Sequence, residues 1–367
     1  MKPFVPEELP LKSLRWERYI PLIGKANRAL AMYEGLLHGL ANPDILLSPI
    51  TTQEAVLSSK IEGTQATLGE VFKFEAGEHF QEEGKMHDIQ EIINYRRAMR
   101  FAVGQLEKLP LTLNLLRAIH AILLDSVRGR DKGLGQFRTI QNWIGPEGSP
   151  IEQANFVPPS PLILMEFLDN FEKYIHLEEP DSLVQLAIVH AQFEIIHPFI
   201  DGNGRVGRIL IPLFLYQKDI LSSPLFYLSA YLEKNREEYI QRLRFIDEKD
   251  GWDRWIYFFL TALIEQATVN IGKAKAVMEF YENLKERLIG LTHSQFAIPL
   301  LDAMFNQPIF RSSDLNLKKS SKQTIINLLK QLKEAGILKL LRESSGRRAQ
   351  VFALHELINL CEGKEVI

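Results

Sequence analysis

Apolar residues recur at three- and four-residue steps along most of the chain, which is the spacing of an amphipathic helix. The spacing becomes regular near Lys25, after an opening segment whose prolines exclude a long helix. Pro43 and Pro49 end that helix, and Thr51, with Glu54 as its capping-box partner, predicts the start of the next one. Helical spacing then returns over residues 91–106, 112–126, 161–177, 182–196, 205–216, 236–246 and 252–288. The pattern therefore predicts a mainly α-helical protein.

One long segment, residues 129–161, interrupts the helical spacing. It is rich in glycine and proline and holds two strand-like pieces, residues 138–144 and 155–157. A long loop with hairpin character inside a helical region is typical of a binding element or a lid. A plain surface connection has the same composition, so the pattern by itself leaves both interpretations open.

The last part of the chain differs in order and in charge. Residues 290–367 hold eleven Lys or Arg and seven Asp or Glu, a net charge of +4. Helices are expected at 294–305 and 320–335 with a short helical turn at 312–315 between them, followed by strands at 337–342 and 350–354 around a Ser-Ser-Gly turn, so that the order is helix, short helix, helix, β-hairpin. This is the order of a winged helix-turn-helix.

Composition places the chain among ordinary globular proteins. It has 367 residues, a net charge of −3, 46% hydrophobic and 24% charged residues, which fits two or three domains and excludes a mainly disordered chain. A single cysteine, Cys361, excludes an intramolecular disulfide and fits a reducing compartment. The longest apolar run, residues 209–216, is too short to cross a bilayer, so we expect a cytoplasmic protein without a membrane partner.

The candidate chemistry is concentrated in residues 197–208, which read HPFIDGNGRVGR. A helix that ends near residue 196 delivers His197, and a second helix begins near Gly204. The free N–H groups at the start of a helix form an anion site. Arg205 and Arg208 stand three residues apart on one side of that helix and suit a polyphosphate.

Two further side chains of this segment suit phosphate chemistry. His197 is a base whose charge changes near neutral pH. Asp201 could hold Mg²⁺ if phosphates supply the remaining oxygen ligands. A tight corner, surface arginines and a capping histidine would explain each feature singly, but their combination within twelve residues favours a site. His190, seven residues before His197, is interpreted as structural.

Residues 197–208 resemble the H-P-F-x-[DE]-G-N-G-R-x-x-R signature of the Fic family at every defined position, and residues 187–196 are similar to its lead-in helix. Members of that family mostly transfer AMP from ATP to a hydroxyl group of a target protein. The resemblance implies Mg²⁺ as cofactor, ATP as co-substrate, a protein target and His197 as the catalytic base. It assigns Asp201 to the metal, and to the phosphates Gly202, Asn203, Gly204, Arg205, Val206, Gly207 and Arg208.

The resemblance also implies a division of the chain. An N-terminal helical region would span residues 1–110, the catalytic core 111–265 and a linking helix 266–290, ahead of a winged helix at 291–367. The segments Gly135–Arg138 and Trp143–Gly145 resemble the family's flap, a hairpin that aligns the target and touches ATP. Asn142, Trp143, Ile144 and Gly145 are its candidate nucleotide contacts. Tyr231, Asn235 and Tyr239 are candidates for the adenine pocket, or else core aromatics and a helix cap.

A second resemblance lies upstream, where residues 58–63 read SSKIEG and fit the family's inhibitory motif [ST]-x-x-x-E-[GN]. Ser58 and Glu62 stand four residues apart and share a helix face. The resemblance implies that Glu62 pairs with Arg208 and keeps it from the γ-phosphate. By itself the pattern also describes a solvated glutamate ahead of a capping Gly63.

Two other functions remain open from the sequence. A related enzyme would transfer phosphate or another phosphate-linked group. A DNA-binding regulator would use the basic C-terminal residues, namely Lys318, Lys319, Lys322, Arg347 and Arg348. A winged helix for dimerisation or target docking explains the same basic residues equally well. The resemblance to the family also leads us to expect that the enzyme can modify itself.

Overall fold

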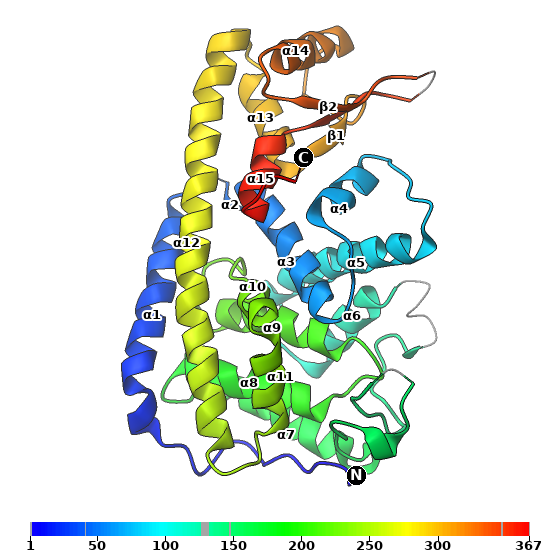
Figure 1. The fold of residues 1–367 in the computed structure, drawn as a ribbon. Coiled ribbons are helices and arrows are strands. Elements are labelled where there is room, and N and C mark those ends of the chain that lie inside the picture. The colour runs from blue at the N-terminus through cyan, green and yellow to red at the C-terminus, as the bar shows by residue number, and fades with distance from the viewer. Residues whose placement is uncertain (1, 41, 126–131, 147, 346–347, 367) are drawn as a thin grey trace. The chain divides into compact units, whose positions relative to one another are not determined.

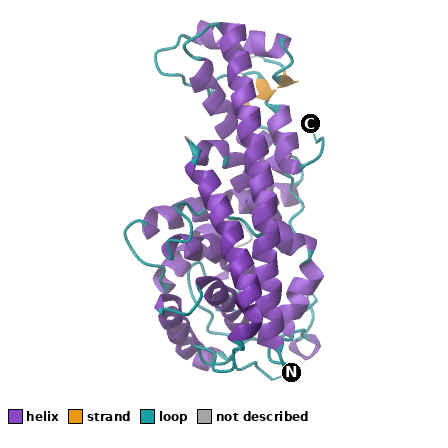
Figure 2. Cartoon of the chain, turned by 90° about the vertical axis from the view of Figure 1, so that its left-hand side faces the viewer, coloured by secondary structure: helices purple, strands orange, loops and turns teal. Residues whose placement is uncertain are grey.

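The computed structural model describes residues 2–40, 42–125, 132–146, 148–345 and 348–366. The ribbon is predominantly helical (Figures 1 and 2). Among the sequence predictions, those on residues 129–131, Gly346 and Arg347 lie outside the described residues. The first helices are α1 (Trp16–His38), α2 (Pro43–Leu46), α3 (Ser48–Ile61), α4 (Leu68–Glu75), α5 (Glu83–Leu106) and α6 (Leu113–Leu123). After the short 3₁₀ turns η2 (Ile151–Gln153) and η3 (Pro161–Ile163) come α7 (Leu164–His176), α8 (Ser182–Ile196), α9 (Asn203–Gln217), α10 (Ser229–Lys234), α11 (Arg236–Arg244) and α12 (Gly251–Thr292).

The prediction of a mainly helical protein is confirmed, but two N-terminal details are wrong. Helix α1 begins well before Lys25 and contains Pro21. Pro21 is the sixth residue of α1 and therefore removes one helical hydrogen bond, but the buried side chain of Tyr19 anchors this part of the helix. Helix α3 begins at Ser48, because a proline suits the first turn of a helix.

The capping box expected at Thr51 lies elsewhere. The Thr51 hydroxyl donates to the carbonyl of Leu47 at 3.2 Å, inside the helical stretch. The box is formed at the start of α4, where the N–H of Glu70 donates to the Thr67 hydroxyl at 3.3 Å and the N–H of Thr67 donates to the Glu70 carboxylate at 2.9 Å. A threonine followed three residues later by a glutamate therefore occurs twice in this region, and only the second pair has the required geometry.

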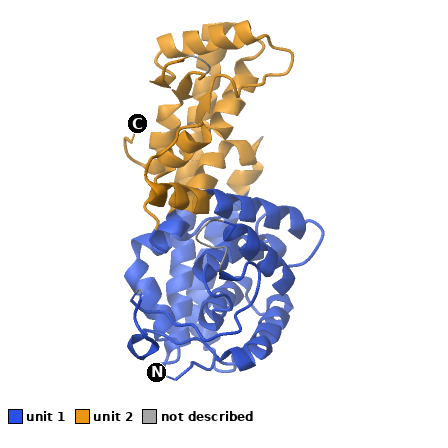
Figure 3. Cartoon of the chain, turned by 90° about the vertical axis from the view of Figure 1, so that its right-hand side faces the viewer, with its two compact units in different colours: residues 1–34, 57–63, 93–268 blue, residues 35–56, 64–92, 269–367 orange. Residues whose placement is uncertain are grey.

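The chain divides into two compact units (Figure 3). Unit 1 comprises residues 1–34, 57–63 and 93–268, and unit 2 comprises residues 35–56, 64–92 and 269–367. The expected boundary between the core and a linking helix, at 265/266, lies inside the continuous helix α12. Compact units follow spatial proximity, so the sequence boundaries at 110, 265 and 290 stay predictions.

Helices α8 and α9 form the centre of unit 1. All residues of α8 from Leu183 to Phe193 are buried, and α8 packs against α7 on one side and α9 on the other. From α12, the buried Trp255 donates its indole N–H to the carbonyl of Ala187 at 2.7 Å. A helix that is apolar all round is a core helix. The loop that joins α8 to α9 is therefore held by the best-packed part of the unit.

Unit 2 carries the strands. Its C-terminal part runs α13 (Ala297–Asn306), β1 (Ile309–Arg311), α14 (Lys322–Glu334), β2 (Lys339–Arg342), β3 (Val351–Ala353) and α15 (His355–Glu362). The strands form an antiparallel sheet in the order β1-β3-β2. The prediction of a short helix between α13 and α14 is wrong, because residues 312–320 contain turns but no helix. Over the residues that the structure describes, no helix is both long and apolar enough to cross a membrane.

Candidate active site

The loop between α8 and α9 brings two left-handed backbone residues close together. His197 follows the last residue of α8 with φ 49° and ψ 60°, and its N–H donates to the carbonyl of Phe193 at 3.0 Å. Gly202 has φ +78° and directly precedes α9. A positive φ is uncommon outside glycine and marks a position that the surrounding structure enforces. Here it turns the chain so that His197 and the start of α9 meet.

The His197 side chain is prepared to accept a proton. Its Nδ1 lies 3.3 Å from the carbonyl oxygen of Glu194, which can only accept, so Nδ1 carries the hydrogen and Nε2 keeps a lone pair. Burial is the main cause that lowers the pKa of His197 to about 4, and the charge of Arg138 contributes to this shift. The imidazole is therefore neutral at physiological pH.

Side chains inside and outside the signature brace this loop. The Asn203 amide accepts from the N–H of Phe199 at 2.9 Å and donates to the carbonyl of Phe199 at 2.8 Å. Asn142 donates to the same carbonyl at 3.0 Å. Because both polar atoms of Asn203 are engaged in this way, its expected contact with a phosphate stays a prediction.

His120 of α6 is a site residue that the sequence analysis missed. Its Nδ1 accepts from the N–H of Gly135 at 3.0 Å, and its Nε2 donates to the carbonyl of Asp201 at 3.0 Å. The ring stacks on Phe199 with centroids 3.8 Å apart. Burial lowers the pKa of His120 to about 4, so the neutral ring links the base of the flap to the Asp201 loop. A histidine on the apolar face of a helix gave no signal of this role.

Arg208 is enclosed by the residues of the upstream motif. Its Nε donates to the Ser58 hydroxyl at 2.8 Å, and its Nη2 donates to the Ser58 carbonyl at 2.9 Å and to Glu62 Oε1 at 2.5 Å. Burial alone would raise the pKa of Glu62, but the charge and hydrogen bond of Arg208 outweigh it and hold that pKa below its usual value. The two groups form a charged pair at neutral pH.

Glu62 also lies against the start of α9. A Cβ atom added at Gly204 would collide with Glu62 Oε1, so the carboxylate occupies space next to the helix N-terminus. Further along α9, a Cβ at Gly207 would collide with Glu194 Oε1, and Val206 is fully buried. Val206 and Gly207 of the signature therefore serve the close packing of α9 against its neighbours in the site.

The other charged residues of the signature lie nearby. The Arg205 guanidinium is 3.8 Å from Asp201 Oδ1 and is almost completely buried. The Asp201 carboxylate is half exposed and accepts from the N–H of Gly202 at 2.6 Å. Within the described chain no group of three or more histidine, cysteine or acidic residues could hold a metal ion. A lone, half-exposed carboxylate such as that of Asp201 is a possible metal ligand where a bound phosphate supplies further oxygens.

A cavity of about 500 Å³ in unit 1 brings many of these groups together. His197, Gly204, Arg208 and Glu62 line it, with Tyr239 of α11 and the flap residues Trp143, Ile144 and Gly145. The other predicted site residues are not among its lining residues, namely Ser58, Asn142, Asp201, Gly202, Asn203, Arg205, Val206, Gly207, Tyr231 and Asn235.

The flap has less strand structure than the sequence predicts. Among the described residues of 138–157, Ile144 and Phe156 form one antiparallel bridge, with the N–H of Ile144 donating to Phe156 at 2.8 Å. The two strands expected at 138–144 and 155–157 are absent from these residues. Proline lacks the N–H that a ladder needs, and Pro146, Pro150 and Pro158 flank the bridge.

Of the three candidates for the adenine pocket, only Tyr239 lines the cavity, whereas Tyr231 and Asn235 do not. Tyr239 reaches the cavity and shares a hydrogen bond of 3.0 Å with His190, whose other ring nitrogen lies 3.0 Å from the carbonyl of Gly207. Burial lowers the pKa of His190 to about 3, in agreement with a structural role. Asn235 donates to the carbonyl of Tyr231 at 2.9 Å, and the Tyr231 ring packs on Phe258.

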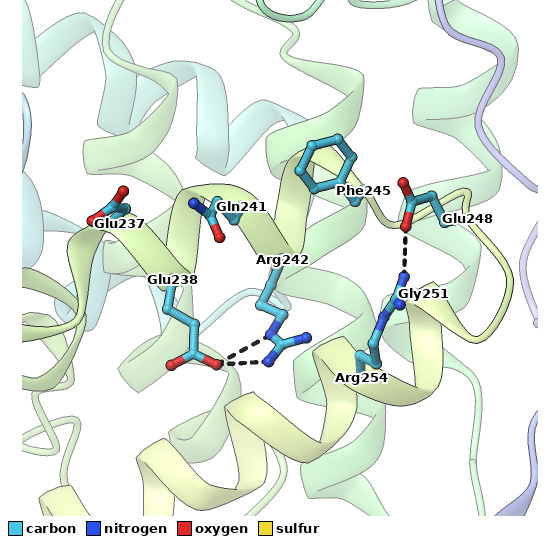
Figure 4. Close-up of a pocket in the computed structure, with 8 residues that line it drawn as sticks. All are labelled: Glu237, Glu238, Gln241, Arg242, Phe245, Glu248, Gly251 and Arg254. Atoms are coloured by element: carbon cyan, nitrogen blue, oxygen red, sulfur yellow. Dashed lines mark hydrogen bonds and ion pairs between the residues drawn. The ribbon is translucent and has the colours of Figure 1, made fainter.

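A second hollow of unit 1 is shown in Figure 4. It is lined by residues of α11, of the loop that follows it and of the start of α12, and by none of residues 197–208. Both of its arginines are paired, Arg242 with Glu238 at 2.8 Å and Arg254 with Glu248 at 2.9 Å. None of the described residues that line it is a histidine.

Comparison with known families places the chain. The model of the Fic/DOC family N-terminal region matches residues 20–104, which include Glu62, and the Fic/DOC family model matches residues 110–215, which include His197 and Arg208. The two matches together cover about half of the chain, and the chain belongs to the Fic/DOC family.

Curated proteins that are similar to this chain are named as protein adenylyltransferases. The chain is 28% identical over 191 residues to a probable protein adenylyltransferase of Aquifex aeolicus, which covers 50% of this chain and 55% of the relative. It is 30% identical over 162 residues to the protein adenylyltransferase Fic of Drosophila grimshawi, which covers 42% of this chain and 31% of the relative. The chain thus spans about half or less of these relatives.

Solved structures share the fold. A Fic family protein of Desulfovibrio desulfuricans matches with a TM-score of 0.59 and 20% identity, over 95% of this chain and 98% of that one. Fic-1 of C. elegans matches with a TM-score of 0.53 and 22% identity, over 70% of this chain and 75% of that one.

Proposed function

We propose that this chain is a protein adenylyltransferase, which moves AMP from ATP to a hydroxyl group of a target protein and releases pyrophosphate. The observation that carries the proposal is the neutral His197 imidazole, with a free Nε2, in one cavity with Arg208 and the start of α9. The names of the curated relatives point to the same activity.

In the proposed reaction His197 acts as the general base. The target oxygen attacks the α-phosphorus while its proton passes to Nε2 of His197. The bond from the α-phosphorus to the oxygen that bridges to the β-phosphorus breaks, and its electron pair leaves with pyrophosphate. The products are an AMP ester on the target and a protonated imidazole, which returns its proton to solvent.

The phosphates would bind at the start of α9. Its first N–H groups and its positive dipole end attract anions, and Arg205 and Arg208 add guanidinium donors. Asp201 would hold a divalent metal such as Mg²⁺, which neutralises charge on the phosphates when it is bound. We assign the adenine side to Tyr239 and to Trp143, Ile144 and Gly145 of the flap, because these residues line the same cavity.

We further propose that Glu62 inhibits the enzyme. A γ-phosphate and the Glu62 carboxylate compete for the Arg208 fork, and Glu62 holds it through the 2.5 Å pair. ATP bound beside Glu62 would have its outer phosphates displaced and its α-phosphorus out of line for attack.

The position of the label distinguishes this activity from that of a related phosphate transferase. The full chain is incubated with Mg²⁺ and ATP labelled at the α- or at the γ-phosphate. We expect the α-label to enter protein, including the chain itself, and the γ-label to appear in pyrophosphate. Protein labelled from the γ-position would instead indicate a phosphotransferase.

The same assay tests the metal ligand. Asp201→Asn keeps the size of the side chain and removes its charge, so we expect at least about tenfold less labelling at limiting Mg²⁺, with partial recovery at high Mg²⁺. Glu152→Gln, an exposed carboxylate near the flap, is the matched control and is expected to behave as wild type. An unchanged Mg²⁺ response in Asp201→Asn would remove this residue as the ligand.

We infer that residues 291–367 form a winged helix-turn-helix. The order α13, β1, α14, β2, β3 supports this inference. Lys318 and Lys319, just before α14, and Lys322, its first residue, are exposed. If this part binds DNA, the full chain will retard mixed duplex DNA in a gel at low salt and release it at moderate salt. No retardation at low salt would favour docking of a protein target or a dimer.

A further inference from the structure

Arg138 is a buried guanidinium at the base of the flap, 3% exposed. Its Nε donates to the carbonyl of His197 at 2.9 Å, and its Nη2 donates to the carbonyls of Pro159 at 2.6 Å and Ile196 at 3.3 Å. Its own N–H donates to the carbonyl of Pro198 at 2.9 Å. A single residue therefore joins both ends of the flap to the loop between α8 and α9, residues 197–202, which we call the catalytic loop.

The contacts of Arg138 serve the end of α8. The last carbonyls of a helix have no partner within the helix and carry the negative end of its dipole, which favours a cation there. Arg138 satisfies two of these carbonyls, on Ile196 and His197. It thereby holds His197 in the left-handed conformation that turns the imidazole into the cavity.

The charge of Arg138 is not neutralised by a carboxylate. No ion pair of Arg138 exists among the described residues, and its Nη1 is buried without a hydrogen-bond partner there. Burial lowers the pKa of Arg138 to about 10, so the group is still charged at physiological pH. Burial of a cation costs free energy unless hydrogen bonds compensate it. The Arg138 guanidinium has such hydrogen bonds to backbone carbonyls, one of them that of His197.

We propose that Arg138 is the positioning residue for His197: it clamps the His197 backbone and places an uncompensated positive charge beside the imidazole. The proposal rests on the proposed role of His197 as the base. The charge disfavours the imidazolium ion, so that Nε2 is free to accept a proton from the target hydroxyl. Three other groups raise the pKa of the imidazole: the carbonyl of Glu194, the Glu62 carboxylate directly after α3, and the Asp201 carboxylate.

Two substitutions separate the clamp from the charge. Arg138→Lys keeps the charge and loses the fork, and Arg138→Met loses both. In the Glu62→Gly background we expect both variants to lose at least about tenfold in kcat, with the KM for ATP within about twofold. The acidic limb of the pH profile should move upward by about one pH unit in Arg138→Met and stay in place in Arg138→Lys.

The control is Arg117→Gln. The exposed Arg117 also donates to a flap carbonyl, that of Gly135 at 2.8 Å, but it does not touch the catalytic loop. We expect the pH profile of this variant to remain that of the parent.

A direct titration of the His197 ring by NMR measures the effect without any transfer reaction, with His197→Gln to assign the signal. An upward shift in Arg138→Met supports the proposal even if the reaction is another one. An unmoved His197 titration in Arg138→Met, or full kcat in Arg138→Lys, would overturn it. If Arg138→Met does not fold, Arg138→Lys alone decides: full kcat overturns the clamp, and loss of kcat with the unchanged acidic limb supports it.

Discussion

Replacing His197 with alanine is expected to lower the rate of AMP transfer by about a thousandfold or more, because removal of a general base typically costs two to four orders of magnitude. His197 is the only histidine among the described residues that line the cavity, and the nearby Arg208 is charged, with its donors facing Ser58 and Glu62. The measurement is labelling from α-labelled ATP in the Glu62→Gly background, with ATP binding followed separately.

The backbone at His197 needs its own control. Its φ of 49° disfavours alanine by about 1 kcal/mol, so part of a loss could reflect the loop rather than the base. His197→Asn tolerates this conformation better and lacks the base, and it should be as inactive as alanine. His176→Ala, an exposed histidine at the end of α7, should transfer AMP as the parent does. Parent-like labelling by both His197 variants would refute the mechanism.

Glu62→Gly is expected to raise labelling by about a hundredfold, without a comparable gain in ATP affinity. The substitution frees the Arg208 fork and the space next to Gly204, both of which Glu62 now occupies. A small misplacement at a reacting centre can cost about a hundredfold in rate, and removal of its cause should recover that factor. The comparison is labelling from α-labelled ATP at saturating ATP for both proteins.

Two variants show whether the gain in labelling comes from loss of the Glu62 charge or from a loosened end of α3. Glu62→Gln keeps an acceptor for Arg208 without the charge, so it should fall between wild type and Glu62→Gly. Glu233→Gln breaks the 2.7 Å pair with Lys60 at the end of α3 but leaves Glu62 in place, so it should stay close to wild type. If wild type and Glu62→Gly label equally, Glu62 is a helix-end residue, and the assignment of His197 is unaffected.

The central helices of unit 1 could be predicted because their sequence is unambiguous. The apolar run before His197, with Pro198 directly after it, gives α8 the bounds that the spacing predicts, Ser182 to Ile196. Glycines on either side of Asn203 allow the sharp turn into α9. Local rules were sufficient because burial and chain geometry act in the same direction here.

Other elements depend on contacts that a single sequence does not display. Strand β1 has three residues, too few for an alternating pattern, and exists because it pairs with β3. His120 and Arg138 look like a core histidine and a loop arginine, and their importance follows from the carbonyl groups that the fold places around them. The strands expected in the flap do not form for the opposite reason. Their β-branched and aromatic residues favour strands, but they lack a continuous partner strand to pair with.

The segment 57–63 enters unit 1 between two stretches of the chain that belong to unit 2. Glu62 is thus carried by an internal part of the polypeptide and tethered on both sides. A tethered group has an effective concentration set by its connections and independent of how much protein is present. The inhibition proposed for Glu62 would therefore resist dilution and low expression alike, and trimming of either terminus would not remove it. Activation would then require a change that displaces the tethered segment, or a ligand that outcompetes Glu62 for Arg208.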